Sequence, residues 1–369
     1  MINISNDFNS NMKETVVVAM SGGVDSTVCA AMMQERGYDV IGVTLQLYDY
    51  GEATCDTSKP SKTCCASKDI FDAQTACEKM GIKHYVLNYE DVFRNEVMQE
   101  FADQYIQGYT PIPCVKCNQT VKFRDLFKIA KKLGASKLVT GHYVQKKQGQ
   151  CGAEMHQGAD AVKDQSYFLF QTTKEQLEFL DFPLGHLTKP QTRELARKYG
   201  LAISEKPDSQ NICFVPDGNY AKVVEKFHPN SAKQGNIVEI ETGKTLGTHH
   251  GIIHYTIGQR RGLGIGGGNP LYVCRLDVKT NTVFVGEYKH ILRDVFTIKE
   301  PHFLLNDGEQ LPQNLTVRVR SSCVPIACEI NSNIVTLREK ISFIAPGQAA
   351  VFYNHNRMLG GGYIEEIIE

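Results

Sequence analysis

The stretch "AMSGGVDST", residues 19–27, has the glycines of a phosphate-binding loop but carries an aspartate and lacks the lysine of a Walker loop. Gly22 and Gly23 allow the backbone to approach phosphate oxygens, two serines offer hydroxyl groups, and a following helix would present unpaired N–H groups to an anion. Asp25 would repel a bare phosphate. We therefore expect a bridging Mg²⁺ ion here, which would also neutralise a departing pyrophosphate.

Two cysteine-containing segments are candidates for thiol chemistry. "TPIPCVKCNQTVKF" places Cys114 and Cys117 in a CxxC motif just before an expected helix that carries Lys122 and Arg124. The positive end of a helix and nearby cations stabilise a thiolate, so this pattern predicts thiol pKa values below about 8.5. "KPDSQNICFV" places Cys213 in a turn-rich segment, where a lone cysteine is more often a buried packing residue.

A zinc site is an alternative interpretation of the CxxC motif. A closed zinc site needs a second pair of ligands, and no other part of the sequence repeats the CxxC spacing. The remaining candidate ligands are cysteines upstream of the motif: Cys55, Cys64 and Cys65.

The elements that must position these groups alternate in the first part of the chain. "TVVVAM" (15–20) and "DVIGVTLQL" (39–47) are buried-strand patterns on either side of a helical pattern at 26–36. A strand, a glycine turn, a helix and a strand within about 30 residues form a βαβ unit and predict a parallel sheet. The alternation continues with expected helices at 64–80, 90–106, 121–134, 173–180 and 189–199, and expected strands at 82–88 and 136–143.

The residue pattern changes at two places further along the chain. Residues 144–164 are polar and contain glycine, which predicts a mobile loop. After about residue 217, short alternating segments separated by glycine turns indicate hairpins. We therefore predict an α/β fold: a doubly wound parallel-sheet domain at 1–217, a small mixed domain at 218–288 and a C-terminal β-barrel at 289–369.

Composition limits the class of protein. The 369 residues are 42% hydrophobic and 22% charged, which suits two or three globular domains. No run approaches the roughly 18 apolar residues of a membrane span, and the first residues lack a signal-peptide pattern, so we expect a cytoplasmic protein with no membrane partner. There the 12 cysteines stay mostly reduced. Because the net charge is −1, any nucleic-acid contact must come from a local basic patch.

The motifs resemble those of a known family. "SGGVDS" is similar to the PP-loop of ATP pyrophosphatases, which cleave ATP between its α and β phosphates to adenylate a substrate oxygen. Together with "PCVKCN", "KDQSYFL", "FPLG", "DSQNICF", "YTIGQRRGLGIGG" and "PGQAAVFY", it occurs in the order seen in tRNA-specific 2-thiouridylases, over nearly the whole chain from about residue 14. The resemblance implies ATP-dependent 2-thiolation of the wobble uridine of tRNA, by adenylation of the C2 oxygen and sulfur transfer from a cysteine persulfide.

The resemblance also implies roles for individual residues. In that family the cysteine before Asn, here Cys117, is the nucleophile, and the cysteine of "ICF", here Cys213, carries the persulfide. The implied ATP-binding residues are Ala19, Met20, Ser21, Gly22, Gly23, Val24, Asp25, Ser26, Leu45 and Gly141. The implied tRNA-binding residues are Ile112, Pro113, Cys114, His142, Lys163, Asp164, Gln165, Arg320, Ser321 and Gln348.

Two patterns can also be interpreted from the residues alone, without the resemblance. Lys163 and Asp164 resemble a surface ion pair. Arg318 and Arg320 alternate with valines, so both are expected on one face of a barrel strand.

The implied cofactors and partners follow from the chemistry. ATP is the cosubstrate and Mg²⁺ its counterion, and tRNA is the acceptor. A cysteine desulfurase or relay protein supplies persulfide sulfur, and an external reductant opens the Cys117–Cys213 disulfide that sulfur transfer leaves behind.

Two alternatives stay open. Some family members have an aspartate three residues before the nucleophile, where this chain has Cys114. Cys114, Cys117 and Cys213 could instead ligate an iron–sulfur cluster, an interpretation that we do not favour. An amide-forming PP-loop synthetase would use the same loop and would need no paired thiols.

Overall fold

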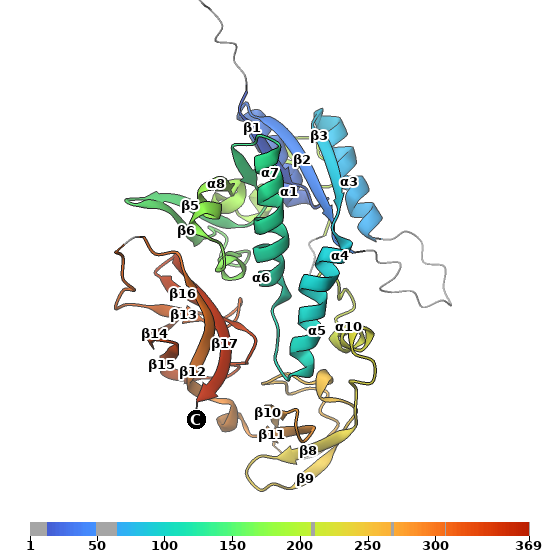
Figure 1. The fold of residues 1–369 in the computed structure, drawn as a ribbon, viewed down its shortest axis with the longest axis vertical. Helices are drawn as coiled ribbons and strands as arrows, with labels where there is room; N and C mark the ends of the chain where they lie inside the picture. The colour runs from blue at the N-terminus through green and yellow to red at the C-terminus, as the bar shows by residue number, and fades with distance from the viewer. Residues whose placement is uncertain (1–12, 49–64, 208–210, 267–268, 307, 369) are drawn as a thin grey trace, which may run out of the picture.

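The computed structural model describes residues 13–48, 65–207, 211–266, 269–306 and 308–368, and these form three separate sheets (Figure 1). The first sheet has five parallel strands in the order β3-β2-β1-β4-β7. Its strands are β1 (Thr15–Ala19), β2 (Asp39–Gln46), β3 (Lys83–Asn88), β4 (Lys137–Val139) and β7 (Leu180–Asp181). The three central valines of β1 are fully buried, as expected for a strand covered on both faces.

Helices cover both faces of this sheet, because alternate valines of β1 pack into two different buried clusters. The first cluster contains residues of α1 (Val24–Glu35), α3 (Cys65–Met80) and α9 (Lys189–Lys198). The second contains residues of the helical segment η2 (Asn118–Leu126), of α7 (Phe127–Lys132) and of α8 (Lys174–Phe179). The predicted doubly wound α/β arrangement is therefore confirmed.

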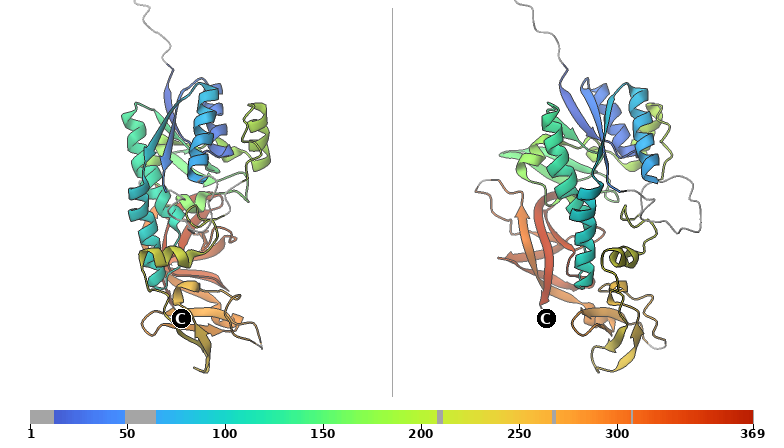
Figure 2. Two further views of the ribbon diagram at one scale, coloured as in Figure 1. Left: turned by 90° about the vertical axis from the view of Figure 1, so that its right-hand side faces the viewer. Right: turned by 45° about the vertical axis from the view of Figure 1, so that its right-hand side comes forward.

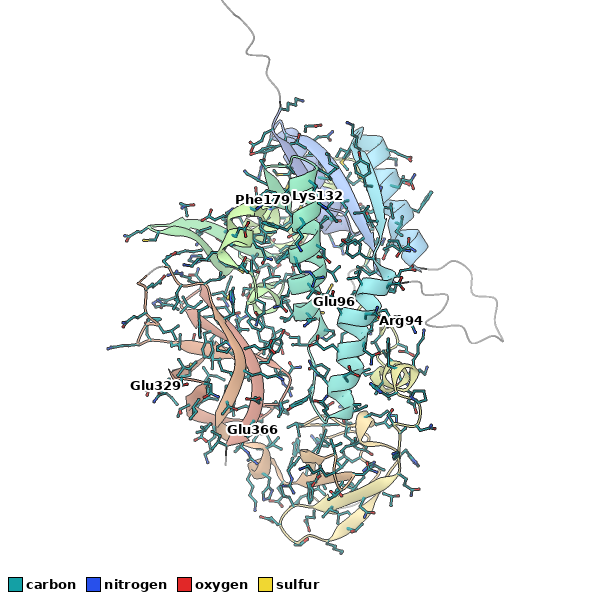
Figure 3. The ribbon with its side chains drawn as sticks, in the orientation of Figure 1. Arg94, Glu96, Lys132, Phe179, Glu329 and Glu366 are labelled. Carbon is teal, nitrogen blue, oxygen red and sulfur yellow. The ribbon has the colours of Figure 1, made fainter. Side chains whose placement is uncertain are left out.

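Two long helical segments extend from this sheet. The first comprises α4 (Glu90–Phe93), a π-helical stretch η1 (Arg94–Met98) and α5 (Gln99–Ile106), and it runs from the parallel sheet to the second sheet (Figure 2). The second comprises α6 (Pro113–Cys117), η2 and α7. Glu96 of the first segment (Figure 3) links the two segments, because its side chain accepts a hydrogen bond of 2.9 Å from Arg124 of η2.

The second sheet is mixed, as predicted. Its order is β10-β11-β8-β9, with β11 and β8 parallel and the other pairs antiparallel. The strands are β8 (Gly235–Glu239), β9 (Thr245–His249), β10 (Tyr272–Asp277) and β11 (Thr282–Gly286). Helix α10 (Tyr220–Phe227) precedes them, and its Tyr220 stacks on Tyr105 of α5 with ring centroids 6.2 Å apart.

The third sheet closes into the predicted C-terminal β-barrel. The order β12-β15-β14-β13-β16-β17 is completed by antiparallel pairing of β12 with β17, so the six strands form a ring. The strands are β12 (Arg293–Phe303), β13 (Thr316–Arg318), β14 (Ile326–Asn331), β15 (Ile334–Ile341), β16 (Ala349–Asn354) and β17 (Arg357–Ile368). Closure pairs the strand edges that an open sheet would expose.

The prediction of a mobile loop at 144–164 is wrong. Strands β5 (Val144–Gly149) and β6 (Gly152–Gln157) form an antiparallel hairpin, and β6 pairs with β17. Val144 and Met155 of the hairpin are fully buried in the core of the first domain. The hairpin thus joins the barrel sheet to the α/β domain.

Short helical turns complete the described fold. They are η3 (Ser166–Leu169), η4 (Pro183–His186), η5 (Ile252–His254) and η6 (Tyr288–Ile291). Within the described ranges, no helix combines the length and the apolar character needed to cross a membrane.

Gly360 of β17 tests the closure of the barrel. Its φ is +131°, and a Cβ atom there would lie 2.1 Å from the carbonyl oxygen of His302 on β12. We expect Gly360→Ala to lower the free energy of unfolding by about 3 kcal/mol, from backbone strain together with the steric clash. Gly134→Ala is the control, because Gly134 has φ +73° with no atom within 4 Å, and we expect a loss of about 1 kcal/mol.

Urea unfolding followed by tyrosine fluorescence measures both variants, since the chain contains no tryptophan. Equal losses for the two variants would show that the contact between β12 and β17 does not constrain residue 360.

Candidate active site

One cavity of about 980 Å³ collects most of the predicted site residues at the carboxyl ends of β1, β2 and β4. From the ATP-binding set, its wall contains Ser21, Gly23, Val24, Asp25 and Leu45. From the thiol and tRNA-binding sets, it contains Ile112, Pro113, Cys114, Cys117, His142, Lys163, Gln165, Cys213, Arg320, Ser321 and Gln348. The predicted residues that are not part of the wall are Ala19, Met20, Gly22, Ser26, Gly141 and Asp164.

The glycines of the loop are required by close packing. Gly22 has φ +71°, and a Cβ atom on it would lie 2.0 Å from the carbonyl oxygen of Asp69 in α3. A Cβ atom on Gly141 would lie 3.0 Å from the Cβ of Asp25. The Ser26 hydroxyl accepts a hydrogen bond of 3.1 Å from the Ser21 N–H, which closes the loop over the start of α1. Gly22 and Gly141 therefore face closely packed protein atoms, which explains why neither lines the cavity.

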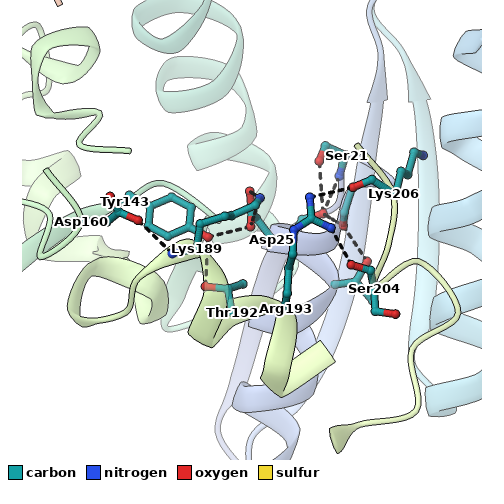
Figure 4. A network of polar contacts seen from close by, with 12 residues as sticks. Ser21, Asp25, Tyr143, Asp160, Lys189, Thr192, Arg193, Ser204 and Lys206 are labelled. Atoms are coloured by element: carbon teal, nitrogen blue, oxygen red, sulfur yellow. Dashed lines mark hydrogen bonds and ion pairs between the residues drawn. The ribbon is translucent and has the colours of Figure 1, made fainter. Parts of the chain in front are cut away.

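The charge of Asp25 is balanced within the protein. Both carboxylate oxygens accept hydrogen bonds of 2.8 Å from Nζ of Lys189, the first residue of α9 (Figure 4). The Tyr143 hydroxyl donates a further bond of 2.9 Å to Oδ1. The backbone N–H of Lys189 donates to Asp160 at 2.9 Å, which fixes the start of the helix. The cation that the structure places at Asp25 is thus a lysine that lies 164 residues further along the chain.

A second distant lysine holds the loop from its other side. Nζ of Lys206 donates to the carbonyl oxygen of Gly22 at 2.8 Å, to Asp69 at 2.7 Å and to Asp72 at 2.5 Å. Sequence reasoning missed both Lys189 and Lys206, because nothing in the local pattern around either one marks it as a partner of residues 21–26.

Arg193 connects these two lysines (Figure 4). It lies one turn after Lys189 in α9, and its guanidinium donates to the carbonyl oxygens of Ser204 at 2.6 Å and of Lys206 at 3.0 Å. The chain then continues to Cys213 on the cavity wall. Helix α9 therefore holds both the aspartate of the loop and the backbone of Ser204 and Lys206.

The CxxC motif is part of a helix, contrary to the expectation that it precedes one. Pro113 stands at the first turn of α6, and Cys114 and Cys117 follow within that turn. A proline at this position has no N–H to leave unpaired and has the helical φ, which explains the earlier start. Arg124 is engaged by Glu96 and Asp125, so it does not serve the thiols.

The expected low thiol pKa values are wrong for this structure. Burial raises the pKa of Cys114 and of Cys117, and it raises the pKa of Cys213 to about 12. The charge of Lys122, which lines the same cavity, lowers all three values but by less than burial raises them. A thiolate loses its hydration inside the protein, and a single cation does not compensate for that loss.

The three cysteines lie close enough to influence one another, since thiolate charge on Cys117 and Cys114 further raises the pKa of Cys213. Among the described residues, however, no three His, Cys, Asp or Glu side chains are arranged to hold a metal ion. Of the cysteines considered for a zinc site, Cys55 and Cys64 lie outside the described residues, as does the side chain of Cys65.

The opposite wall of the cavity is built from the first domain and the barrel. His142 is half-buried and its Nδ1 lies 2.9 Å from the Thr140 hydroxyl. Burial and the charge of Lys122 hold its pKa well below the usual value, so the imidazole is neutral at pH 7. From the barrel, Gln348 donates to the carbonyl oxygen of Thr110 at 2.9 Å. Arg320 donates to the carbonyl oxygen of Phe343 at 3.1 Å.

Arg318 and Arg320 alternate with Val317 and Val319, which are both buried in the barrel core, but only Arg318 lies within a strand. Strand β13 ends at Arg318, whose side chain is 13% exposed and pairs with Asp164 at 2.9 Å. Arg320 lies beyond the strand and reaches the cavity. The interpretation of Lys163 and Asp164 as a surface ion pair is wrong, because Asp164 is buried against the barrel.

Three protein-family models match the chain. A tRNA methyl transferase HUP domain matches residues 14–217, a tRNA methyl transferase PRC-barrel domain matches 222–287, and an aminomethyltransferase beta-barrel domain matches 293–364.

Curated relatives match over nearly the full length. The tRNA-specific 2-thiouridylase MnmA of Rickettsia bellii (strain OSU 85-389) is 54% identical over 366 residues, covering 96% of this chain and 98% of the relative. The protein of the same name from Rickettsia conorii is 52% identical over 361 residues, covering 95% of each chain.

Solved structures match more distantly. The U34-tRNA thiolase NcsA from Methanococcus maripaludis with its [4Fe-4S] cluster is 16% identical with a TM-score of 0.34, covering 61% of this chain and 70% of that chain. A 4-thiouridine synthetase in complex with RNA and ATP is 19% identical with a TM-score of 0.37, covering 58% and 51%.

The thiol pKa values predict slow alkylation of Cys213 in the free protein. With a pKa of about 12, its thiolate fraction at pH 8 is on the order of 10⁻⁴. We expect iodoacetamide to modify the exposed Cys151 first, and the rate at Cys213 to rise about tenfold per pH unit from pH 7 to pH 10. Peptide mass spectrometry measures both rates. A rate at Cys213 that levels off below pH 9 would contradict the effect of burial.

Proposed function

The chain belongs to the family of tRNA-specific 2-thiouridylases, and from this membership we propose that it is an ATP-dependent tRNA-uridine 2-sulfurtransferase. The proposal rests on one observation: a single cavity is lined by the PP-loop, by Cys117 and Cys213, and by residues of the barrel. An adenylating loop and two thiols on one wall are the parts that thiolation of a base requires.

Adenylation comes first, because the C2 oxygen of uridine is a poor leaving group. ATP transfers AMP to that oxygen and releases pyrophosphate, so that AMP becomes the leaving group. The N–H groups at the start of α1 and the ammonium of Lys189 supply positive charge for the phosphates. Lys189 exchanges Asp25 for phosphate oxygens as pyrophosphate charge develops. Mg²⁺ accompanies ATP as its counterion, and no residue is assigned to the ion, since the described residues contain no group of metal ligands.

Sulfur transfer uses the two thiols in turn. The terminal sulfur of a persulfide on Cys213 attacks C2, and AMP departs with the former uridine oxygen. The Cys117 thiolate then attacks Sγ of Cys213, and the electron pair of the broken S–S bond stays on the sulfur at C2. The products are 2-thiouridine and a Cys117–Cys213 disulfide, which an external dithiol reduces by two electrons. If hydrosulfide is released before it attacks C2, the same two thiols are used.

The acceptor is the wobble uridine of tRNA. Its anticodon loop is single-stranded, so turning one base out of the stack costs only a few kcal/mol. The neutral His142 and the amides of Gln165 and Gln348 line the cavity and can hydrogen-bond an uncharged base. A cysteine desulfurase or relay protein supplies the persulfide. The free thiols suit the reducing conditions of the cytoplasm.

The alternatives require a different use of the same cavity. An iron–sulfur cluster would need three converging cysteine ligands, and the described residues do not present such a group. An amide-forming PP-loop synthetase would release pyrophosphate without tRNA and would tolerate the loss of either thiol.

Cysteine variants separate these alternatives. We expect Cys117→Ser and Cys213→Ser each to abolish thiolation while keeping tRNA-dependent pyrophosphate release, because adenylation precedes sulfur transfer. Cys114→Ser should be mild, within about fivefold of the wild-type rate. Thiolation, pyrophosphate release and bound iron are measured on protein prepared without oxygen. Loss of iron together with activity in Cys114→Ser would favour the cluster, and pyrophosphate release without tRNA would favour the synthetase.

Lys189→Met tests the adenylation step of the proposed reaction. Removing a cation that stabilises charge in the transition state costs about 10²- to 10³-fold in rate, so we expect pyrophosphate release to fall by that factor with unchanged affinity for tRNA. Lys198→Met is the control on the same helix, because Lys198 is 65% exposed and pairs with Glu35 at 3.6 Å. Equal rates for the two variants would remove Lys189 from the reaction.

A further inference from the structure

Asp164 occupies an unusual environment for a member of a tRNA-binding motif. Its side chain is 2% exposed. The carboxylate accepts hydrogen bonds from the backbone N–H of Gly158 at 3.0 Å, the backbone N–H of Ser166 at 3.1 Å and the Ser166 hydroxyl at 2.9 Å. The fourth donor is Nη1 of Arg318 at 2.9 Å. All four donors are protein groups.

Arg318 comes from the barrel, and its side chain is also surrounded by protein groups. Its guanidinium lies over the ring of Tyr353, 5.1 Å from the centroid, and the Tyr353 hydroxyl lies 3.1 Å from the Ser166 hydroxyl. Its Nε is buried without a hydrogen-bond partner. A buried guanidinium with an unpaired N–H costs stability, so its charge depends on the single carboxylate that faces it.

Asp164 and Arg318 do not line the cavity, but their neighbours in the sequence do, both in the first domain and in the barrel. Lys163 and Gln165, which flank Asp164, line the cavity, whereas Asp164 does not. Arg320, two residues after Arg318, lines it from the barrel. The side chain of Gln165 accepts a hydrogen bond of 2.9 Å from the backbone N–H of Tyr143, next to His142.

We infer that Asp164 is a positioning residue and not a tRNA ligand: with Arg318 it holds the base-facing residues of the first domain in register with those of the barrel. The inference rests on the proposed function, because it concerns the tRNA side of the same cavity. In the motif "KDQ", Lys163 and Gln165 line the cavity, whereas Asp164 connects the first domain to the barrel through Arg318.

The physical argument is that the wall is shared between two domains. Removing either member leaves the other as a buried unpaired charge, which relaxes by moving its segment toward water. Displacing Lys163, Gln165 or Arg320 by about 1 Å is enough to weaken binding of an oriented base. The PP-loop is held by Lys189 and Lys206 through hydrogen bonds that do not involve Asp164 or Arg318, so we expect the ATP side to keep its geometry.

The experiment is a double-mutant cycle on the full chain with Asp164→Asn, Arg318→Met and the double variant. The tRNA dissociation constant is measured by filter binding, KM for ATP from pyrophosphate release, and the midpoint of thermal unfolding in parallel. We expect each single variant to raise the tRNA dissociation constant about tenfold and to leave KM for ATP within twofold. The double variant should bind tRNA no more weakly than the weaker single variant but still less tightly than the wild type, because it buries no unpaired charge and yet lacks the link between the two domains.

The matched control is a half-buried ion pair of the barrel region. Arg357 donates to both carboxylate oxygens of Glu309, at 2.5 Å and 3.0 Å, and neither residue lines the cavity. Arg357→Met should lower the unfolding midpoint without changing the tRNA dissociation constant. A purely structural role for Asp164 would give it that same pattern and overturn the inference.

Other outcomes are equally decisive. Weakened tRNA binding in Asp164→Asn but not in Arg318→Met would make Asp164 a direct ligand, and additive effects would separate the two residues. Should a single variant fail to fold, the double variant, which buries no unpaired charge, carries the comparison, and wild-type affinity there overturns the inference. A wild-type chain that does not bind tRNA would instead overturn the proposed function.

Discussion

The ion pair between Asp25 and Lys189 is the constraint on which the organisation of the site depends. A loop that receives anionic phosphates cannot keep an unbalanced carboxylate, so a cation must come from elsewhere in the fold. The cation is the first residue of α9, and that helix also holds the backbone of residues 204–206 through Arg193. Lys206 then returns to the carbonyl oxygen of Gly22. The segment that leads to Cys213 is therefore held by the same helix that neutralises the loop.

Burial sets the second constraint. The burial that raises the pKa of Cys117 and of Cys213 keeps both thiols protonated. Lys122 opposes this effect without overcoming it. Both thiols are therefore weak nucleophiles in the free protein. Under the proposed function, their reactivity depends on what enters the cavity.

The sequence predicted what local patterns encode and missed what depends on distant contacts. The strand, glycine turn and helix at 15–35 follow from β-branched residues, from glycines and from helical periodicity, and all three appear in the structure. The hairpin at 144–157 was missed because most of its residues are polar and only Val144 and Met155 are fully buried. The pairs Asp25–Lys189 and Asp164–Arg318 join residues 164 and 154 positions apart, and no local signal reports such pairing.

The barrel contacts the first domain at several places, and three of them show how the cavity is completed. Strand β6 pairs with β17, Asp164 pairs with Arg318, and the N–H of Thr110 donates to the carbonyl oxygen of Pro346 at 2.7 Å. A Cβ atom on Gly347 would lie 2.9 Å from the side chain of Tyr109, so the two surfaces fit closely there. Arg320, Ser321 and Gln348 bring the barrel to the cavity wall. Under the proposed function the barrel therefore shapes the side of the cavity that receives the base, whereas the phosphate-binding loop is held by Lys189 and Lys206 of the first domain.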